Sequence, residues 1–204
     1  MSSTTILYIV AGYLSGSVLF ARLAAAVLGK GEVENAGEDR NPGAANAFRC
    51  GFWCGVIALV GDLGKAFWPV FCYCRFSGGL LQGPISLALV IAAPVVGHAL
   101  PLWHHFKGGK GIASSFGSLL GLFPFWQPAV LFAVIFVFFS VVLRIDPHFY
   151  RTVVTYLVTA VTFFFRYPAG VWGGFALISG TVLLRLHWSK EHRAKPAVKL
   201  LWMR

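Results

Sequence analysis

Seven long apolar runs restrict what this chain can fold into. They lie at about residues 5 to 28, 53 to 75, 80 to 97, 112 to 123, 126 to 143, 149 to 165 and 168 to 186. About 20 apolar residues in a helix are enough to cross the ~30 Å hydrocarbon core of a bilayer. Charged residues make up 12% of the chain, well below the roughly 25% that is typical of soluble domains. The sequence therefore predicts an all-α integral membrane protein with seven transmembrane helices.

The chain shows no division into separate domains. It contains no long internal repeat, no low-complexity segment and no extended polar linker, so we predict a single membrane-embedded domain over residues 1–204. The fourth run is short for a bilayer. We therefore expect it to begin inside the protein, beside a glycine-rich loop that dips into the membrane.

The positive charges between the runs predict an orientation. Lys and Arg number 17 against 7 Asp and Glu, and outside the runs only Arg75 and Arg166 fall on the side away from the C-terminal tail. By the positive-inside rule the N-terminus is external, and the C-terminus and the polar loops are cytoplasmic, in a multi-pass protein of the cell (inner) membrane. Apolar runs separate the cations from one another, which argues against a nucleic-acid partner.

The most informative loop reads Gly97-His98-Ala99-Leu100-Pro101, then Phe106-Lys107-Gly108-Gly109-Lys110-Gly111. Its glycines let backbone N–H groups turn toward a ligand, Lys107 and Lys110 add positive charge, and a helix expected from Ile112 favours an anion at its N-terminus. These features are typical of a phosphate site. A flexible basic loop that touches lipid headgroups is the alternative.

The long loop from Gly29 to Gly51 also suits an oxygen-rich ligand. Asn41 and Asn46 offer amide donors, Arg49 can bind phosphate or carboxylate through two hydrogen bonds, and Pro42-Gly43 favours a turn. The alternative is a solvated loop that faces the lipid surface.

Two charges lie inside the second apolar run, three residues apart. Asp62 and Lys65 share one helical face, and each costs about 2.5 to 3.5 kcal/mol at a bilayer centre. We expect them to pair and to face the bundle interior, either as part of a functional site or as a brace for the polar loops.

A metal site is not expected. The four cysteines occur as Cys50 with Cys54 and Cys72 with Cys74, a spacing that suits small packing residues better than metal ligands. Neighbouring histidines such as His104 and His105 point in different directions, and no carboxylate lies close to them in the sequence.

Taken together, these motifs resemble the PlsY family of acyl-phosphate:glycerol-3-phosphate acyltransferases over nearly the whole chain. The most specific part is Gly97-His98-x-x-Pro101 followed by Phe106 to Ala113. Further matches are Tyr13-Leu14-Ser15-Gly16-Ser17, Asn41-Pro42-Gly43-Ala44 with Asn46 and Arg49, and Asp62-Leu63-Gly64-Lys65. The resemblance implies transfer of a fatty acyl group from acyl phosphate to the sn-1 hydroxyl of glycerol 3-phosphate. The product would be lysophosphatidic acid for phospholipid synthesis, formed without coenzyme A, a metal or another cofactor.

A site follows from the resemblance and from the chemistry of these residues. Lys107, Gly108, Gly109, Lys110 and Gly111 would hold one phosphate, and Asn41, Asn46 and Arg49 a second anion. Asp39 or His98 would take the proton of the attacking hydroxyl, and His98 is the better base because a carboxylate beside Arg40 stays ionised. Supporting roles fall to Ser17, Asp62, Lys65 and His187.

The chain also departs from the family pattern. Glu38-Asp39-Arg40 stands where the family has Gly-Ser-Gly, Ala45 replaces a threonine, and Asp146 to Tyr150 replaces a serine-rich stretch. In the tail, Lys190 falls on an asparagine. These changes leave a second hypothesis, a catalytically silent family member that binds glycerol phosphate or phospholipid as a sensor or carrier. The enzyme hypothesis predicts an apolar channel for an acyl chain beside the phosphate pocket.

Overall fold

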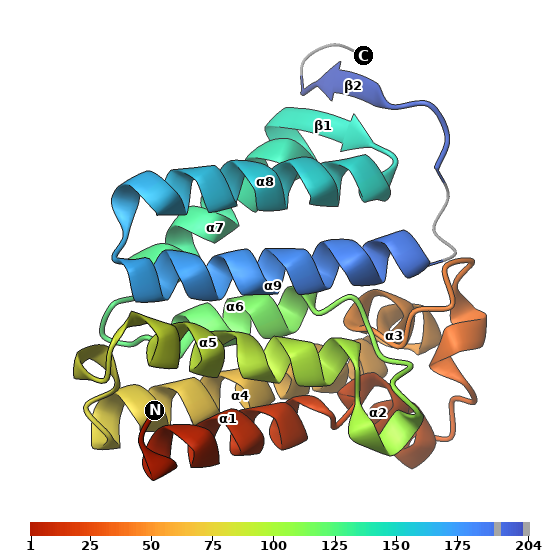
Figure 1. Cartoon of the computed structure of the whole chain (residues 1–204). Coiled ribbons are helices and arrows are strands. Elements are labelled where there is room, and N and C mark those ends of the chain that lie inside the picture. The colour runs from red at the N-terminus through yellow and green to blue at the C-terminus, as the bar shows by residue number, and fades with distance from the viewer. Residues whose placement is uncertain (190–192, 202–204) are drawn as a thin grey trace.

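The computed structural model describes residues 1–189 and 193–201, so the Lys190 departure lies outside the described residues. Long helices dominate the fold and run side by side (Figure 1). They are α1 (Ser3–Gly16), α2 (Phe20–Val27), α3 (Ala44–Cys50), α4 (Phe52–Phe76), α5 (Pro84–Ala99), α6 (Ile112–Leu120), α7 (Gln127–Val137), α8 (His148–Arg166) and α9 (Ala169–Trp188). Single helical turns cover Val33–Ala36, Gly79–Leu81 and Leu102–His104, and a π-helical turn covers Phe138–Val142.

By helix length and hydropathy, fewer of the described helices qualify as membrane spans than the seven apolar runs predict. Among the described residues, α4, α5 with its extension to His104, and α9 are long and apolar enough to cross a membrane. A fourth span results if α1 and α2, bent by 41°, count as one. The seven predicted spans are therefore not confirmed. With 9 and 11 residues, α6 and α7 are too short, and α8 is interrupted by polar threonines.

The first apolar run does not form the single helix expected over residues 5 to 28. The helix stops at Gly16, and Ser17 turns the chain: its hydroxyl donates to the Tyr13 carbonyl at 2.9 Å and accepts the Leu102 N–H at 3.2 Å. The short helix α2 then crosses the end of the bundle, where it lies near the loop after α5 (Figure 1).

Glycines bring the helices close together. A side chain at Gly97 of α5 would collide with the Tyr13 carbonyl of α1, and one at Gly117 of α6 would collide with the Leu63 carbonyl of α4. Small residues at such crossings let backbones approach closely, which is how helices gain packing energy in lipid.

Aromatic side chains fill the other half of the core, between α7, α8 and α9. Phe132 and Phe175 have ring centroids 5.2 Å apart, and Tyr156 stacks on Phe175 at 5.7 Å. The Tyr156 hydroxyl donates to Ser115 of α6 at 2.9 Å, so this cluster also fixes α6 against α8.

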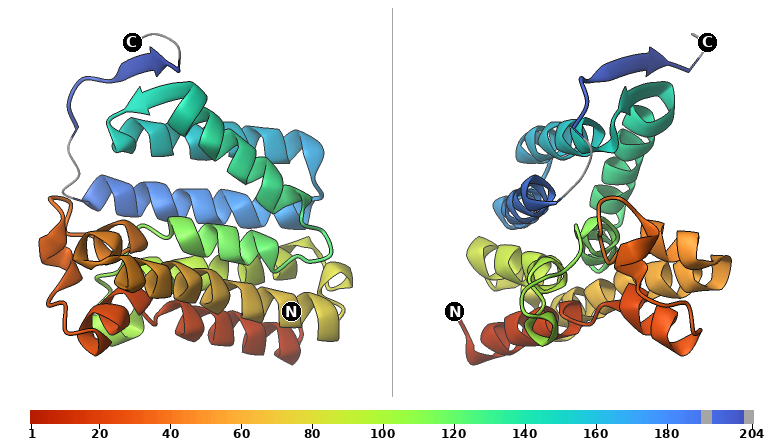
Figure 2. Two further views of the ribbon diagram at one scale, coloured as in Figure 1. Left: turned by 180° about the vertical axis from the view of Figure 1, so that it is seen from behind. Right: turned by 90° about the vertical axis from the view of Figure 1, so that its right-hand side faces the viewer.

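A two-stranded antiparallel sheet departs from the all-α prediction. β1 (Leu143–Asp146) pairs with β2 (Ala197–Leu200), with Leu143 opposite Leu200. Both strands lie at the outer edge of the molecule beside α8 (Figures 1 and 2). A strand of four residues leaves too short a pattern to be recognised in a sequence.

The polar loops gather at one end of the bundle. The loop between α2 and α3, the loop between α5 and α6, the start of α8 and the end of α9 all lie at this end (Figure 1). The glycine-rich loops predicted to form a common site therefore do meet. The assignment of residues 1–204 to a single domain stays a prediction.

Candidate active site

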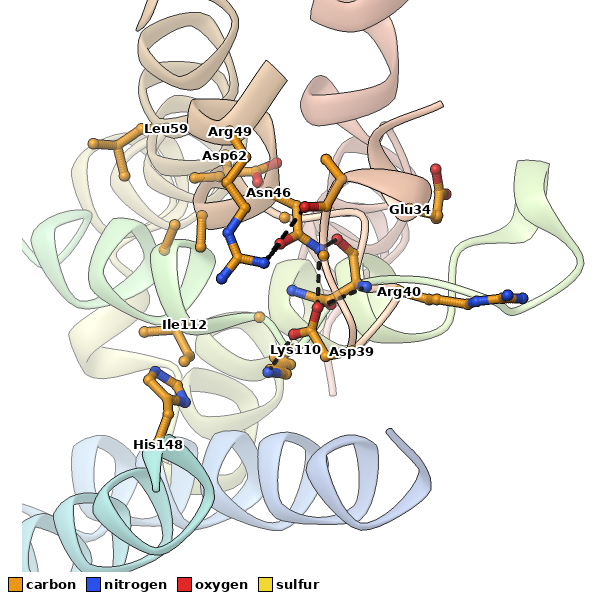
Figure 3. Close-up of a pocket in the computed structure, with 18 of the residues that line it drawn as sticks. Glu34, Asp39, Arg40, Asn46, Arg49, Leu59, Asp62, Lys110, Ile112 and His148 are labelled. Carbon is orange, nitrogen blue, oxygen red and sulfur yellow. Dashed lines mark hydrogen bonds and ion pairs between the residues drawn. The ribbon is translucent and has the colours of Figure 1, made fainter. Parts of the chain in front are cut away.

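A pocket of about 1270 Å³ opens between these loops. The loop from Glu34 to Arg49 forms one wall, and residues of α4, α5, α6, α7 and the start of α8 complete it (Figure 3). The residues outside the Glu34–Arg49 loop are Leu59, Asp62, His98, Lys110, Gly111, Ile112, Ala113, Phe116, Phe136, Pro147 and His148.

Asp39 lies at the centre of the polar contacts in this pocket. Its carboxylate accepts hydrogen bonds from Lys110 Nζ at 2.8 Å, Asn46 Nδ2 at 2.9 Å and the Asn41 N–H at 3.3 Å (Figure 3). The Lys110 side chain is 7% exposed and that of Asp39 21%. A lysine, an amide and a backbone N–H are the donors that a phosphate would attract, and here they hold a carboxylate of the chain itself.

This environment changes the acidity of Asp39. Burial alone would raise the pKa of its carboxyl group, but the hydrogen bond and the charge of Lys110, with help from Asn46 and Asn41, outweigh burial and hold the pKa below its usual value. Asp39 is therefore ionised at neutral pH and is a weak base.

The backbone around Asp39 is tightly turned. Arg40 has a φ of 49°, in the left-handed region that few residues other than glycine adopt. Its side chain extends away from the Asp39 carboxylate (Figure 3). Asn46 is buried and also donates to the Asn41 carbonyl at 2.9 Å. The Asn46 amide thus braces the loop, and Arg49 lies exposed at the pocket rim, 3.4 Å from Asn46 Oδ1.

The Lys107–Gly111 loop presents only part of itself to the pocket. The Gly109 N–H donates to the His98 carbonyl at 3.1 Å, so this N–H group already has a hydrogen-bond partner within the protein. The Gly108 carbonyl accepts two hydrogen bonds from Arg185 of α9, at 3.1 and 2.5 Å. Among the glycines of this loop, Gly111 has a positive φ, 85°. Lys110 and Gly111 line the pocket, and α6 begins at Ile112 as predicted.

Lys107 is placed differently from Lys110. Its side chain is exposed and is not part of the pocket wall. Its carbonyl lies 3.5 Å from Arg22 Nη2, and Arg22 pairs with Glu34 at 2.5 Å. Two arginines, Arg22 and Arg185, therefore hold successive carbonyl groups at the start of the loop.

The predicted ion pair inside the membrane helix is confirmed. Lys65 Nζ lies 2.7 Å from Asp62 Oδ1, and both side chains are almost completely buried. His98 of α5 joins them, with Nδ1 2.8 Å from Lys65 Nζ. Asp62 and His98 also line the pocket.

Two of the predicted supporting residues lie away from the pocket wall. Ser17 is buried at the break between α1 and α2, where it holds the turn. His187 is exposed near the end of α9.

Apolar side chains also line the pocket. They are Leu59, Ile112, Ala113, Phe116 and Phe136, from α4, α6 and α7. Phe116 lies against Phe136, with ring centroids 6.0 Å apart. Leu59, Phe116 and Phe136 belong to no motif, and only the packing of three helices brings them together.

Sequence reasoning also missed the roles of Arg185 and His148. Nothing in the sequence around Arg185 indicates its contact with Gly108. His148 belongs to the stretch that replaces a serine-rich segment of the family, and this departure is the available signal that Pro147 and His148 line the pocket.

The fold and the site define a class of protein: a helical membrane protein with a pocket that both polar and apolar side chains line. Comparisons with known proteins agree with this class. The family profile described as "Glycerol-3-phosphate acyltransferase" matches residues 6–196. The chain belongs to this family.

Individual relatives give the same result. A glycerol-3-phosphate acyltransferase of Laribacter hongkongensis is 32% identical over 185 residues, which cover 90% of this chain and 89% of the relative. One from Pseudomonas paraeruginosa is 42% identical over 122 residues, and the match spans 59% of this chain and 60% of the relative.

Solved structures show the same fold. The crystal structure of PlsY (YgiH), an integral membrane glycerol 3-phosphate acyltransferase, in its glycerol 3-phosphate form has a TM-score of 0.76 at 24% identity, covering 91% of this chain and 89% of that one. Its lysophosphatidic acid form has a TM-score of 0.72. The chain is a multi-pass integral membrane protein.

Proposed function

We propose that this protein transfers a fatty acyl group from acyl phosphate to the sn-1 hydroxyl of glycerol 3-phosphate. The observation that carries the proposal is the lining of the pocket. Lys110, Asn46 and Arg49 supply polar groups, and Phe116 and Phe136 supply apolar rings to the same cavity. Such a pocket suits one substrate with a phosphate head and a long acyl chain, next to a second, small phosphorylated substrate.

The reaction needs alignment and charge stabilisation more than a protein nucleophile. The sn-1 oxygen attacks the acyl carbon, a new ester C–O bond forms, and the bond from carbon to the phosphate oxygen breaks. The proton of the attacking hydroxyl ends on the departing phosphate. Inorganic phosphate and lysophosphatidic acid are the products. Holding two anionic substrates side by side supplies much of the rate, and donors near the departing phosphate stabilise its charge.

The proposed contacts divide between the two loops. Lys110 and the N–H of Gly111 at the start of α6 hold one phosphate, and Arg49 at the rim holds the second. Gly108 and Gly109 shape the loop, and exposed Lys107 attracts anions toward it. Asn41 and Asn46 position Asp39. The contact between the Asp39 carboxylate and Lys110 Nζ has to break before Lys110 can bind a phosphate.

The sequence also supports a location for the reaction. We propose that the N-terminus lies outside the cell membrane, and that the pocket and the C-terminus are cytoplasmic, in agreement with the positive-inside rule. Both substrates would then reach the pocket from the cytoplasm and the inner leaflet.

The competing function is ligand binding without catalysis. It is favoured by the ion pair that Lys110 already forms with Asp39. The test is acyl transfer by the detergent-purified protein from palmitoyl phosphate to labelled glycerol 3-phosphate. Formation of lysophosphatidic acid with release of one inorganic phosphate per product supports the proposal. Glycerol 3-phosphate binding with no product supports the competing function. Growth of a strain that lacks its own acyltransferase gives an independent answer.

A further inference from the structure

Three buried titratable side chains meet at the inner wall of the pocket. The side chains of Asp62, Lys65 and His98 are 1%, 3% and 4% exposed. Lys65 Nζ lies 2.7 Å from Asp62 Oδ1, 2.5 Å from the Val18 carbonyl and 2.8 Å from His98 Nδ1. An ammonium group has three protons and no acceptor, so these three neighbours account for all of its protons.

This arrangement indicates which nitrogen of His98 carries a proton. His98 Nδ1 lies 2.8 Å from Lys65 Nζ and 3.5 Å from Asp62 Oδ1. Because a lysine ammonium can only donate, the shorter contact makes Nδ1 an acceptor. A neutral imidazole whose Nδ1 accepts has its proton on Nε2. A second proton, on Nδ1, would face the Lys65 ammonium and would place two cations beside the single carboxylate of Asp62 in a buried site.

The Nε2 atom faces the glycine-rich loop. A side chain at Gly109 would overlap His98 Nε2, and the Gly109 N–H donates to the His98 carbonyl at 3.1 Å. The next residue, Lys110, lines the pocket together with His98. The ring therefore directs Nε2 toward the loop that holds the phosphate in the proposed function.

We propose that His98 acts as a hydrogen-bond donor, through Nε2–H, to a phosphate oxygen of the substrate, and does not take the proton of the attacking hydroxyl. Lys65 and Asp62 are positioning residues that hold His98 in this tautomer. This assignment rests on the proposed function and replaces the role of base that the sequence suggests for His98. A donor held in place inside a buried site stabilises negative charge on the departing phosphate without rearranging.

The tautomer can be measured without any activity. Nitrogen-15 spectra of histidine-labelled protein in detergent, at neutral pH, distinguish protonated from unprotonated ring nitrogens, and the His98→Gln spectrum identifies the His98 signals by difference. We expect a protonated Nε2 and an unprotonated Nδ1. A protonated Nδ1, or an equal mixture of tautomers, would overturn the proposal.

Substitutions then test the donor role. Glutamine keeps an N–H donor but cannot act as a base, whereas methionine offers neither. We expect His98→Gln to lose about tenfold in kcat, and His98→Met to lose roughly 10²- to 10³-fold, the range for removing one such donor. Equal losses of about 10²- to 10⁴-fold in both variants would indicate a base and refute the proposal. His104→Gln, the same exchange outside the pocket, is the control.

The positioning role needs its own variant. Lys65→Met leaves Asp62 without its ammonium partner inside the bundle and can prevent folding, so the neutral pair Asp62→Asn/Lys65→Met is used beside it. We expect the pair variant to fold, to show both His98 tautomers, and to lose kcat with little change in KM. Retention of one tautomer and of full kcat would contradict this role. If the wild-type protein forms no product, the proposed function fails, and the spectra still decide the tautomer.

Discussion

Replacing Asp39 with serine tests how the pocket selects anions. The Asp39 carboxylate holds Lys110, Asn46 and the Asn41 N–H, which are the donors that a substrate phosphate needs. Serine removes the negative charge and is small enough to leave these donors accessible. We therefore expect Asp39→Ser to bind glycerol 3-phosphate more tightly and, under the proposed function, to transfer acyl groups faster at low substrate concentration.

The distances give the size of both effects. Two unit charges 4 Å apart interact by about 4 kcal/mol at an effective dielectric constant of 20, so a phosphate beside Asp39 is strongly repelled. Because Asp39 is 21% exposed, solvent screens part of this, and a gain of roughly 1.4 to 2.8 kcal/mol, or about ten- to a hundredfold in affinity, is expected. Loss of the contact with buried Lys110 costs about 1 to 3 kcal/mol of unfolding free energy.

The assay is thermal unfolding of the detergent-purified protein with and without glycerol 3-phosphate. Asp39→Ser should unfold at a lower temperature than the wild type without ligand and should gain more from ligand. Glu38→Ser is the matched control, because it removes the same charge from the same loop. Glu38 is exposed, whereas the Asp39 carboxylate lies 2.8 Å from Lys110 Nζ.

The dependence on pH follows from the lowered pKa of Asp39. A depressed pKa in the folded state stabilises the fold above the ordinary Asp value, and this contribution is lost as the pH falls through the lowered pKa. The stability difference between wild type and Asp39→Ser should therefore be constant near neutral pH and shrink in acid. Weaker ligand binding by Asp39→Ser at neutral pH would refute the reasoning and would show that Asp39 takes part in binding.

Further changes have defined outcomes. Gly109→Ala places a methyl group against His98 Nε2 and should weaken phosphate-ligand binding about tenfold or more. Substituting the exposed Lys107 by Gln should cause a smaller loss that shrinks at high salt. The reverse order in ligand-dependent thermal stabilisation would mean that the loop is only a basic lipid-facing segment. Phe116→Trp enlarges an apolar side chain of the pocket wall and should lower activity on long acyl phosphates more than on short ones, and equal loss on both would place the acyl chain elsewhere. Single cysteines introduced in residues 30–50 should react with membrane-impermeant reagents only from the cytoplasm, and external labelling would contradict the proposed orientation.

Many residues that line the pocket were readable from the sequence, because they lie in polar loops between apolar runs. Asp62 with Lys65 predicted a buried pair that the structure contains at 2.7 Å. The anion loop that the glycines and cations around residue 108 predict stays a prediction. The number of spans was not readable in the same way. Hydropathy records that a run is apolar, but not that Ser17 turns the chain or that α6 ends after nine residues.

The direction in which each polar group points was decided by tertiary structure. Asp39 and Lys110 are 71 residues apart in the chain, and only the meeting of two loops shows that they form an ion pair.

The sequence by itself determined a helical membrane protein with charged, glycine-rich loops, since composition and local spacing control burial in lipid and the freedom of the backbone. Only the tertiary structure decided that Lys65 of α4 contacts His98 of α5, that Arg185 of α9 donates to the Gly108 carbonyl, and that Phe116 and Phe136 line the pocket. These contacts join side chains from helices that are distant in the sequence, and their geometry depends on how closely the helices pack at residues such as Gly97 and Gly117.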